Sequence, residues 1–213
     1  MNRRHLVIGT AALAALGFAG ATYLPRRAAP PAGDALIRPH SPVLGPADAA
    51  VTIVEFLDPS CEACRAFYPI VKQIMDVAPG DIRLVIRYAA LHDGSDEAVR
   101  ILEAARIQDR FTPVMERLFA DQPAWAIHGA PDLEKAWTIA AAAGLDLDKA
   151  RRDARTPAVD AVLAQDAADV KTLDVSGTPT FFVNGKPLPS FGPQQLRDLV
   201  LAELKAAGVS PRS

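Results

Sequence analysis

Cysteine is scarce in this sequence. The 213-residue chain has two cysteines, and both lie in one motif, Cys61-Glu62-Ala63-Cys64. With no third cysteine, a disulfide that joins distant segments is excluded. A bond across two intervening residues would add little stability, because disulfides stabilise mainly by constraining long loops. The two cysteines therefore indicate a redox-active dithiol.

Potential metal ligands are scarce as well. Structural zinc sites need four ligands, but the chain has no second cysteine pair, and its histidines stand singly at positions 5, 40, 92 and 128. We interpret His92, in the loop before the helical block, as an ordinary loop residue, with a position in the groove near the dithiol as the alternative. Copper(I) suits soft thiolates, yet the chain has only three methionines and no methionine-rich segment. We expect no metal ion and no other cofactor, with copper(I) binding by the two thiolates as an alternative.

Clusters of basic side chains are also missing. Residues 1–33 contain four arginines and no acidic residue, so residues 34–213 carry 19 basic and 25 acidic side chains, a net charge of −6. An acidic chain without a lysine- or arginine-rich patch lacks the electrostatic footprint of a nucleic-acid-binding protein. We therefore expect no nucleic-acid partner.

Near the start of the chain, an uncharged stretch from Leu6 to Leu24 follows two arginines. A basic start, an apolar run and small residues before the cut are typical of a secretory signal peptide, which predicts cleavage after Ala21 and removal of residues 1–21. The run is almost long enough to span a bilayer, so an uncleaved anchor that ends at about residue 24 is an alternative. A twin-arginine signal is another.

All three interpretations of the leader place the rest of the chain outside the cytoplasm, in an oxidising compartment such as the periplasm. Residues 22–40 include a proline- and alanine-rich stretch and are predicted to be a tether. Membrane attachment is expected only where the leader is retained, because no later segment is apolar enough to span a bilayer.

Residues 41–93 have the pattern of a strand, a helix and a second strand. Val51–Leu57 is almost continuously apolar or β-branched, as in a buried strand. Apolar residues at helical spacing follow over Ala63–Val77, and Ile82–Tyr88 again has the pattern of a strand. The short connections predict a βαβ unit with two parallel strands.

Residues 94–173 show helical spacing and no convincing strand. Ser95, followed by two acidic residues, is typical of a helix N-cap. Prolines at positions 131 and 157 stand where first helical turns would begin, and Gly144 stands where a helix would end. The block is predicted to contain four or five helices in a compact subdomain.

Strands return in residues 174–208. Thr180–Val183 and Pro187-Leu188 flank Asn184-Gly185, the strongest short-range signal for a β-hairpin. Pro193 then begins a last amphipathic helix. The first and last blocks make sense only as one sheet that the helical block interrupts.

Three features of the chain accompany this order of strand and helix blocks: Glu55, the Cys61-Glu62-Ala63-Cys64 motif and Gly177-Thr178-Pro179. On these features the chain resembles thiol–disulfide oxidoreductases of the DsbA-like group, over roughly residues 41–207. The resemblance implies an α/β protein, a thioredoxin fold with an inserted all-helical subdomain.

The two cysteines are expected to differ in environment. A thiol at the start of a helix faces unsatisfied backbone N–H groups and the positive end of the helix dipole, which favour the thiolate. The resemblance implies that Cys61 is the attacking, exposed cysteine and that Cys64 is more buried and resolves the mixed disulfide. It also implies a cis peptide before Pro179, with Thr178 placed to hydrogen-bond an extended substrate by strand addition.

Glu55 lies in the middle of an otherwise apolar strand, before the dithiol. Burying a carboxylate is costly, and members of the DsbA-like group often hold a buried acid here as a proton relay for the second thiol. We expect burial to raise the pKa of Glu55 toward neutrality, where it can take a proton from Cys64. The alternative is that Glu55 faces solvent or pairs with a lysine.

The dipeptide between the cysteines departs from the group's usual choice. Strongly oxidising members typically have Pro-His there, and the histidine helps to hold the thiolate. Here Ala63 has no donor and the negative charge of Glu62 disfavours a thiolate close by, with Arg65 and Lys72 as the expected counter-charges. Cys61 is therefore expected to be less acidic than in those members, and its disulfide less oxidising.

These features predict an exported enzyme, a protein thiol–disulfide oxidoreductase that acts on cysteines of other exported proteins. The segment before the first strand leaves no room for the dimerisation domain of a known isomerase design, which favours a monomeric oxidase of moderate power. A second protein must then recycle the dithiol or disulfide. A disulfide reductase or isomerase is the alternative, because Thr178 is commoner in those branches, and a non-catalytic chaperone-like binder is a further hypothesis.

Overall fold

The computed structural model describes residues 35–212. The predicted leader, residues 1–21, and residues 22–34 of the predicted tether lie outside this range. Among the described residues no helix combines the length and the apolar character needed to cross a membrane.

The centre of the fold is a pair of parallel strands, β2 (Val51–Leu57) and β3 (Ile82–Tyr88), joined by helix α2 (Glu62–Met75). All seven residues of β2 are buried, as expected for a strand in a sheet with both faces covered. The buried residues of α2 recur at helical spacing along one side of the helix. The predicted βαβ unit is confirmed.

Two strands of the hairpin and one short strand complete the sheet. Strand β4 (Thr180–Val183) pairs antiparallel with β2, and β5 (Lys186–Pro187) pairs with β4. The turn between them has positive φ at Asn184 (47°) and Gly185 (80°), the conformation that Asn-Gly hairpins favour. Strand β1 (Val43–Leu44) pairs with β3, so the strand order is β1-β3-β2-β4-β5. Two residues are too few for an alternating pattern, so the sequence did not predict β1.

Different helices cover the two faces of the sheet. On one face, Ile53 of β2 belongs to an apolar cluster shared with α2 and with α9 (Pro193–Ala206). On the other face, Val54 packs with α8 (Pro157–Thr172). Because successive side chains of a strand point to opposite faces, Glu55 lies on the same face as Ile53, beneath α2.

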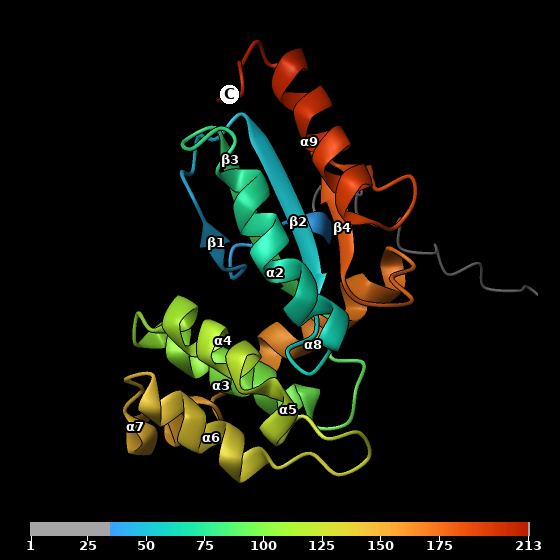
Figure 1. Ribbon diagram of the computed structural model, residues 1–213. Helices are drawn as coiled ribbons and strands as arrows, with labels where there is room; N and C mark the ends of the chain where they lie inside the picture. Colours follow the sequence, from blue (N-terminus) through green and yellow to red (C-terminus); the bar gives the residue numbers. More distant parts are fainter. Residues whose placement is uncertain (1–34, 213) are drawn as a thin grey trace, which may run out of the picture.

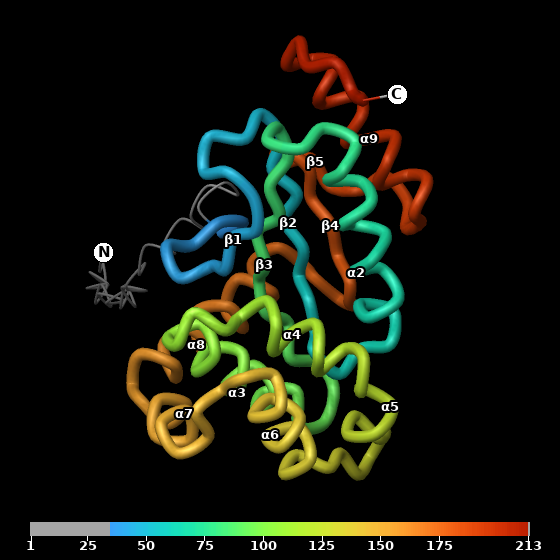
Figure 2. Tube along the Cα trace, turned by 60° about the vertical axis from the view of Figure 1, so that its left-hand side comes forward, coloured from blue at the N-terminus to red at the C-terminus, as the bar shows by residue number. Residues whose placement is uncertain are grey.

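The segment between β3 and β4 forms a helical block at one end of the sheet, below α2 in Figure 1 and again below the sheet in the turned view of Figure 2. Six helices lie within residues 95–172, all of which are described: α3 (Ser95–Ile107), α4 (Phe111–Ala120), α5 (Gln122–Trp125), α6 (Leu133–Ala142), α7 (Leu147–Asp153) and α8. The sequence predicted four or five, and α5 is a single turn that periodicity does not resolve. The α/β fold with an all-helical insert is confirmed.

The start of α3 differs from the prediction. Gly94, with φ of 74°, is the N-cap, and Ser95 is the first helical residue. The Ser95 hydroxyl donates a hydrogen bond to Asp58 at 2.5 Å instead of capping its own helix. The prediction of a Ser95 cap was wrong because a tertiary partner competes for the hydroxyl.

Buried charges tie α8 to β3. Arg87, fully buried in β3, donates hydrogen bonds to Asp166 at 2.7 Å, to Asp169 at 2.6 Å and to the backbone oxygen of Ala35. Arg38 donates to both carboxylate oxygens of Asp169, at 2.8 and 2.7 Å. The described end of the predicted tether is therefore held against the helical block.

Candidate active site

Cys61 is the N-cap residue of α2, with extended backbone angles, and Cys64 lies in the first turn of that helix. Both are free thiols. The side chain of Cys64 has no exposed surface, and Cys61 is 6% exposed. Cys61 is thus more accessible than Cys64, as expected, although it is less exposed than the prediction stated.

The two thiols have opposite acidities. The pKa of Cys61 is lowered to about 5, chiefly by hydrogen bonding with Cys64 and further by Thr178 and by the backbone amides of Cys64 and Ala63, against the effect of burial. Burial raises the pKa of Cys64 well above that of an ordinary thiol. At neutral pH the negative charge therefore resides on Cys61, the better placed nucleophile.

The peptide bond between Thr178 and Pro179 is cis. It faces the dithiol, because the Sγ atom of Cys61 lies 3.3 Å from the carbonyl oxygen of Thr178. Strand β4 begins at Thr180, directly after this peptide. The backbone just before β4 is therefore beside the reactive sulfur and beyond the strand ladder.

Glu55 is completely buried, and neither of its carboxylate oxygens has a hydrogen-bond partner among the described residues. Burial raises its pKa to about 8, and the nearby charge of Cys61 adds to the rise. The charge of Glu55 in turn contributes to the raised pKa of Cys64. The charge of Glu55 therefore interacts with both thiols.

Unpartnered polar atoms gather around this site. In the part of the chain that the structure describes, the buried side-chain oxygens without a hydrogen-bond partner are those of Glu55, the hydroxyls of Ser60 and Thr178, and Oε1 of Gln122. Buried polar atoms are normally paired. Their concentration beside one dithiol is typical of a functional site, where polar groups are kept available.

Asp58 is a site residue that the sequence analysis missed. Its buried carboxylate accepts hydrogen bonds from the backbone N–H groups of Ser60 (2.8 Å), Leu91 (2.8 Å) and His92 (3.0 Å). It also accepts from Ser95, and its own N–H points at the sulfur of Cys64, 3.5 Å away. Asp58 therefore fixes the loop before the dithiol to the loop after β3. The Asp-Pro-Ser sequence before Cys61 is a turn signal that could have drawn attention to it.

Gln122 was also missed. Its side chain is buried, and its amide nitrogen donates to the carbonyl oxygens of Pro59 (2.9 Å) and Cys61 (3.0 Å). Gln122 lies in α5, so the helical block supports the dithiol loop directly. No local pattern in the sequence predicts a contact between residues 61 positions apart.

The surroundings of Glu62 differ from the prediction. Glu62 pairs with His128, whose Nε2 lies 2.9 Å from Oε1 of Glu62. Lys72, an expected counter-charge, instead pairs with Glu116 at 2.7 Å. Lys72 lies ten residues further along α2, about 15 Å at about 1.5 Å rise per residue, so it is too far from Glu62 to pair with it.

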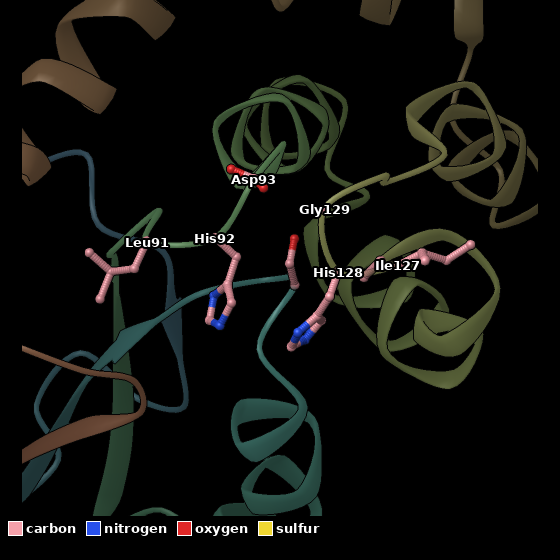
Figure 3. Close-up of a pocket in the computed structure, with 8 residues that line it drawn as sticks. Leu91, His92, Asp93, Ile127, His128 and Gly129 are labelled. Atoms are coloured by element: carbon pink, nitrogen blue, oxygen red, sulfur yellow. The ribbon is translucent and has the colours of Figure 1, made fainter.

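His92 is not an ordinary loop residue, and that interpretation was wrong. Its Nδ1 lies 2.7 Å from Oδ2 of Asp58, and its ring centroid lies 6.0 Å from that of His128. Both histidines line a cavity of about 250 Å3 beside the dithiol loop (Figure 3), together with Ser60, Leu91, Asp93, Ala126, Ile127 and Gly129. Within residues 35–212 no group of three or more histidine, cysteine or acidic side chains is arranged to hold a metal ion.

A family model described as Thioredoxin matches residues 38–201. The chain belongs to the thioredoxin family. Its structural relatives place it among the DsbA-like thiol–disulfide oxidoreductases. The resemblance proposed from the sequence is confirmed.

Several solved structures resemble this DsbA-like protein. A thioredoxin-like oxidoreductase from Silicibacter pomeroyi DSS-3 is 35% identical, with a TM-score of 0.70, over 81% of this chain and 97% of that chain. BdbD from Bacillus subtilis, in its oxidised form, is 25% identical, with a TM-score of 0.69, over 78% of this chain and 94% of that chain. Alpha-DsbA1 from Wolbachia pipientis is 17% identical with a TM-score of 0.69, over 81% and 94% of the two chains, and shows the shared fold.

Curated relatives match the DsbA-like chain over only part of their length. The Na(+)/H(+) antiporter NhaA 1 of Mycobacterium sp. (strain KMS) is 32% identical over 167 residues, which are 73% of this chain and 26% of the relative. The antiporter NhaA of Herminiimonas arsenicoxydans is 32% identical over 148 residues, 68% of this chain and 22% of the relative. The chain spans about a quarter of the length of these relatives.

Proposed function

We propose that this protein is an exported, monomeric oxidase of moderate power, which introduces disulfides into other exported proteins through Cys61 and Cys64. Membership of the DsbA-like group supports disulfide exchange as its chemistry. The observation that carries the proposal is the Cys61 sulfur, with a lowered pKa, beside the carbonyl oxygen of Thr178 in a cis peptide.

The proposed reaction begins with the Cys61–Cys64 disulfide. A thiolate of the substrate attacks the Cys61 sulfur, which forms a mixed disulfide and breaks the bond to Cys64. The Cys64 sulfur leaves as a thiolate and takes up a proton. A second substrate thiolate then attacks the mixed disulfide and releases the Cys61 thiolate. Two electrons pass from the substrate to the protein, the substrate's two thiols lose their protons, and the substrate gains one disulfide.

Glu55 is the proposed proton donor to Cys64. Its pKa of about 8 keeps the carboxyl group protonated at neutral pH, so it can donate when the Cys64 thiolate forms. The high pKa of the buried Cys64 thiol makes the proton transfer favourable. In the reverse direction the same carboxylate would take the proton from Cys64.

Thr178 and Pro179 are the proposed substrate-binding residues. The backbone at the cis peptide lies beside Cys61 and beyond β4, where an extended peptide could add as a strand. Next to it, a hollow of about 140 Å3 is lined by Pro179 and apolar side chains that include Leu188 and Phe191. Phe191 is 60% exposed and stacks on Phe67. An apolar side chain of an unfolded substrate fits this surface.

Glu62 and Ala63 are the proposed redox-tuning residues. A negative charge at position 62 and a side chain without a donor at position 63 stabilise the thiolate less than Pro-His would. A less stable thiolate makes the disulfide a weaker oxidant. A separate redox protein must return the dithiol to the disulfide after each cycle.

The catalytic roles are tested by trapping. In the Cys64→Ser variant the Cys61 thiolate can still attack a disulfide of an exported protein, forming a mixed disulfide while the other substrate sulfur leaves as a thiolate. Without Cys64 this mixed disulfide is not resolved from within the protein, so covalent complexes should accumulate in an exported fraction and disappear on treatment with dithiothreitol. Cys61→Ser should form none and should lose exchange with a model dithiol peptide. Unchanged exchange in Cys61→Ser would exclude the redox function and favour a chaperone-like binder.

The direction of electron flow is tested by the reduction potential of the Cys61/Cys64 pair against glutathione. An oxidase should have a potential well above the glutathione poise, whereas a value near the roughly −270 mV of thioredoxin would identify a reductase. Replacement of Glu62-Ala63 by Pro-His should raise the potential. No change on that replacement would show that the dipeptide does not tune this dithiol.

A further inference from the structure

The Cys61 thiolate lies next to a residue that disfavours it. Glu62 follows Cys61 directly, and the side chain of Ala63 supplies no donor or charge. Like charges at short distance raise the pKa of a thiol, and the lowered pKa of Cys61 comes chiefly from hydrogen bonds with Cys64, Thr178 and backbone amides. Two histidines from outside α2 lie near Glu62, where a positive charge would offset the charge of Glu62.

His92 is held rigidly beside the dithiol loop. Its Nδ1 lies 2.7 Å from the fully buried carboxylate of Asp58, and its backbone N–H donates to the same oxygen at 3.0 Å. Because Nδ1 is engaged by Asp58, protonation of Nε2 turns the ring into a cation of fixed position. The side chain is 35% exposed, so water screens this charge only in part.

His128 approaches from the opposite side. It lies between α5 and α6 in the helical block, and its Nε2 is 2.9 Å from Glu62. Figure 3 shows the His92 and His128 rings on either side of the segment that leads into α2. The ring centroids are 6.0 Å apart. Two imidazoles thus flank the position where Cys61 and Glu62 begin the helix.

We propose that His92 and His128 are positioning residues that stabilise the Cys61 thiolate, so that the oxidising power of the dithiol is set by the helical block as well as by the Glu62-Ala63 dipeptide. His92 acts as a fixed cation oriented by Asp58, and His128 acts by pairing with Glu62. The inference rests on the proposed redox function of Cys61 and Cys64.

The charges around His92 support this arrangement. Burial by itself lowers the pKa of His92, but the hydrogen bond to Asp58 and the charges of Asp58, Cys61 and Glu62 raise it above its ordinary value. The ionisable groups that face the ring or line its cavity are Asp58 and Cys61 from the dithiol loop, Glu62 from α2, Asp93 from its own loop and His128. The interaction with Cys61 is mutual, since a charged imidazole lowers the pKa of the thiol by the same free energy.

The sign of the effect follows from the thiolate. Stabilising the thiolate stabilises the reduced form and makes the disulfide a stronger oxidant. Loss of the imidazole charge should therefore raise the pKa of Cys61 and weaken the oxidant. The effect of His92 should fade at high pH, where its imidazole is neutral in the wild type as well.

The test uses variants that keep the hydrogen bonds and remove the charge. His92→Asn places an amide nitrogen where Nδ1 binds Asp58, and His128→Gln places one where Nε2 binds Glu62. The control is His40→Gln, since His40 makes a similar contact through Nε2 with Asp166, at 2.7 Å, away from the dithiol. The measurements are thiolate absorbance against pH and the equilibrium with glutathione in the full chain.

We expect His92→Asn to weaken the oxidant about tenfold in the glutathione equilibrium at pH 6.5, which corresponds to about 30 mV. The exposed His128→Gln should give a smaller change, about threefold. The ratio of His92→Asn to wild type should approach one at about pH 9, and His40→Gln should show no change at any pH. In a Glu62→Gln background, His128→Gln should have no further effect.

Wild-type potentials in both histidine variants at pH 6.5 would overturn the inference. So would a change in His92→Asn that persists undiminished at pH 9, because the effect of a structural disturbance does not depend on the imidazole charge. The proposed function is tested separately, since Cys61→Ser abolishes exchange in either case. Active variants with unchanged potentials would refute the role of the histidines alone.

Discussion

Glu55 is a buried carboxyl group with no hydrogen-bond partner among the described residues, and burial raises its pKa to about 8. An unpaired buried acid lowers stability whenever it is charged. The same property lets it hold a proton at neutral pH beside Cys64. One side chain thus links the stability of the fold to the chemistry proposed for the site.

The free energy of unfolding should depend on pH because the folded protein holds this proton on Glu55. The folded-state pKa of Glu55 lies above its ordinary 4.5, so between pH 4.5 and 8 the folded state keeps a proton that the unfolded state releases. The free energy of unfolding should therefore fall as pH rises through this window. The Glu55→Gln variant has no such proton and should gain on the order of 3 kcal/mol relative to its parent from pH 5 to 8.

Urea unfolding at pH 5, 6.5 and 8 measures this difference. A Cys61→Ser background removes the thiolate at position 61, and burial, the larger cause of the raised pKa, remains. The exposed Glu134→Gln serves as the matched control and should follow its parent at all three pH values. If the stability difference between Glu55→Gln and its parent does not change with pH, the carboxyl group is not held protonated.

At the scale of elements, α8 is joined to β3 by charges as well as by apolar packing. Arg87 has no exposed surface, and Asp166 and Asp169 of α8 are nearly inaccessible. Burial disfavours the charged form of Asp169, but hydrogen bonds from Arg38, Arg87 and Gln165 together outweigh it and lower the pKa to about 2. The network orients α8 on the face of the sheet opposite α2.

Arg87→Ala should be strongly destabilising. It leaves two buried carboxylates without their central cation, and loss of one partner of a buried ion pair costs about 3–5 kcal/mol. Arg83→Ala is the matched control on the same strand, since Arg83 donates to Thr52 and to the carbonyl of Ala47 near the surface. The control should cost less than about 1 kcal/mol in urea unfolding. Equal losses for the two variants would contradict a special role for the buried network.

At the scale of the whole molecule, the helical block does more than cover one end of the sheet. Gln122 of α5 holds the carbonyl oxygens of Pro59 and Cys61. Asp58 connects the dithiol loop to His92 and to the first residue of α3. The dithiol loop is therefore shaped by contacts from both the thioredoxin part and the insert.

Gln122→Ala should loosen the dithiol loop. It removes the side-chain donor to the carbonyl oxygen of Pro59 and leaves the Cys61 carbonyl with the Arg65 N–H, which should lower the free energy of unfolding by about 1–3 kcal/mol. Amide hydrogen exchange at Cys61, whose N–H donates to the carbonyl of Asp58, should speed up. Gln108→Ala is the control, because Gln108 also makes two hydrogen bonds to backbone, with Asp146, but at an exposed position where water can replace it. A cost no larger than that of the control would contradict this role for Gln122.

Much of the fold was predictable because its signals are local. The apolar run of β2, the helical spacing of α2 and the positive-φ Asn184-Gly185 turn each lie within a few residues of sequence. The interrupted order of the blocks then leaves one sheet as the consistent arrangement. Single-turn α5 and two-residue β1 were missed because they are shorter than the periods that reveal helices and strands.

The sequence by itself determined the thioredoxin fold with its helical insert and the positions of Cys61 and Cys64 at the start of a helix. Only the tertiary structure decided what surrounds them. Asp58 contacts His92, which is 34 positions away in the sequence, and Gln122 contacts Cys61, which is 61 positions away. Such contacts arise when separate elements pack together, so they leave no periodic trace along the chain. The charge partner of Glu62 is likewise His128 from a distant loop, because side chains find their partners in space and not in sequence.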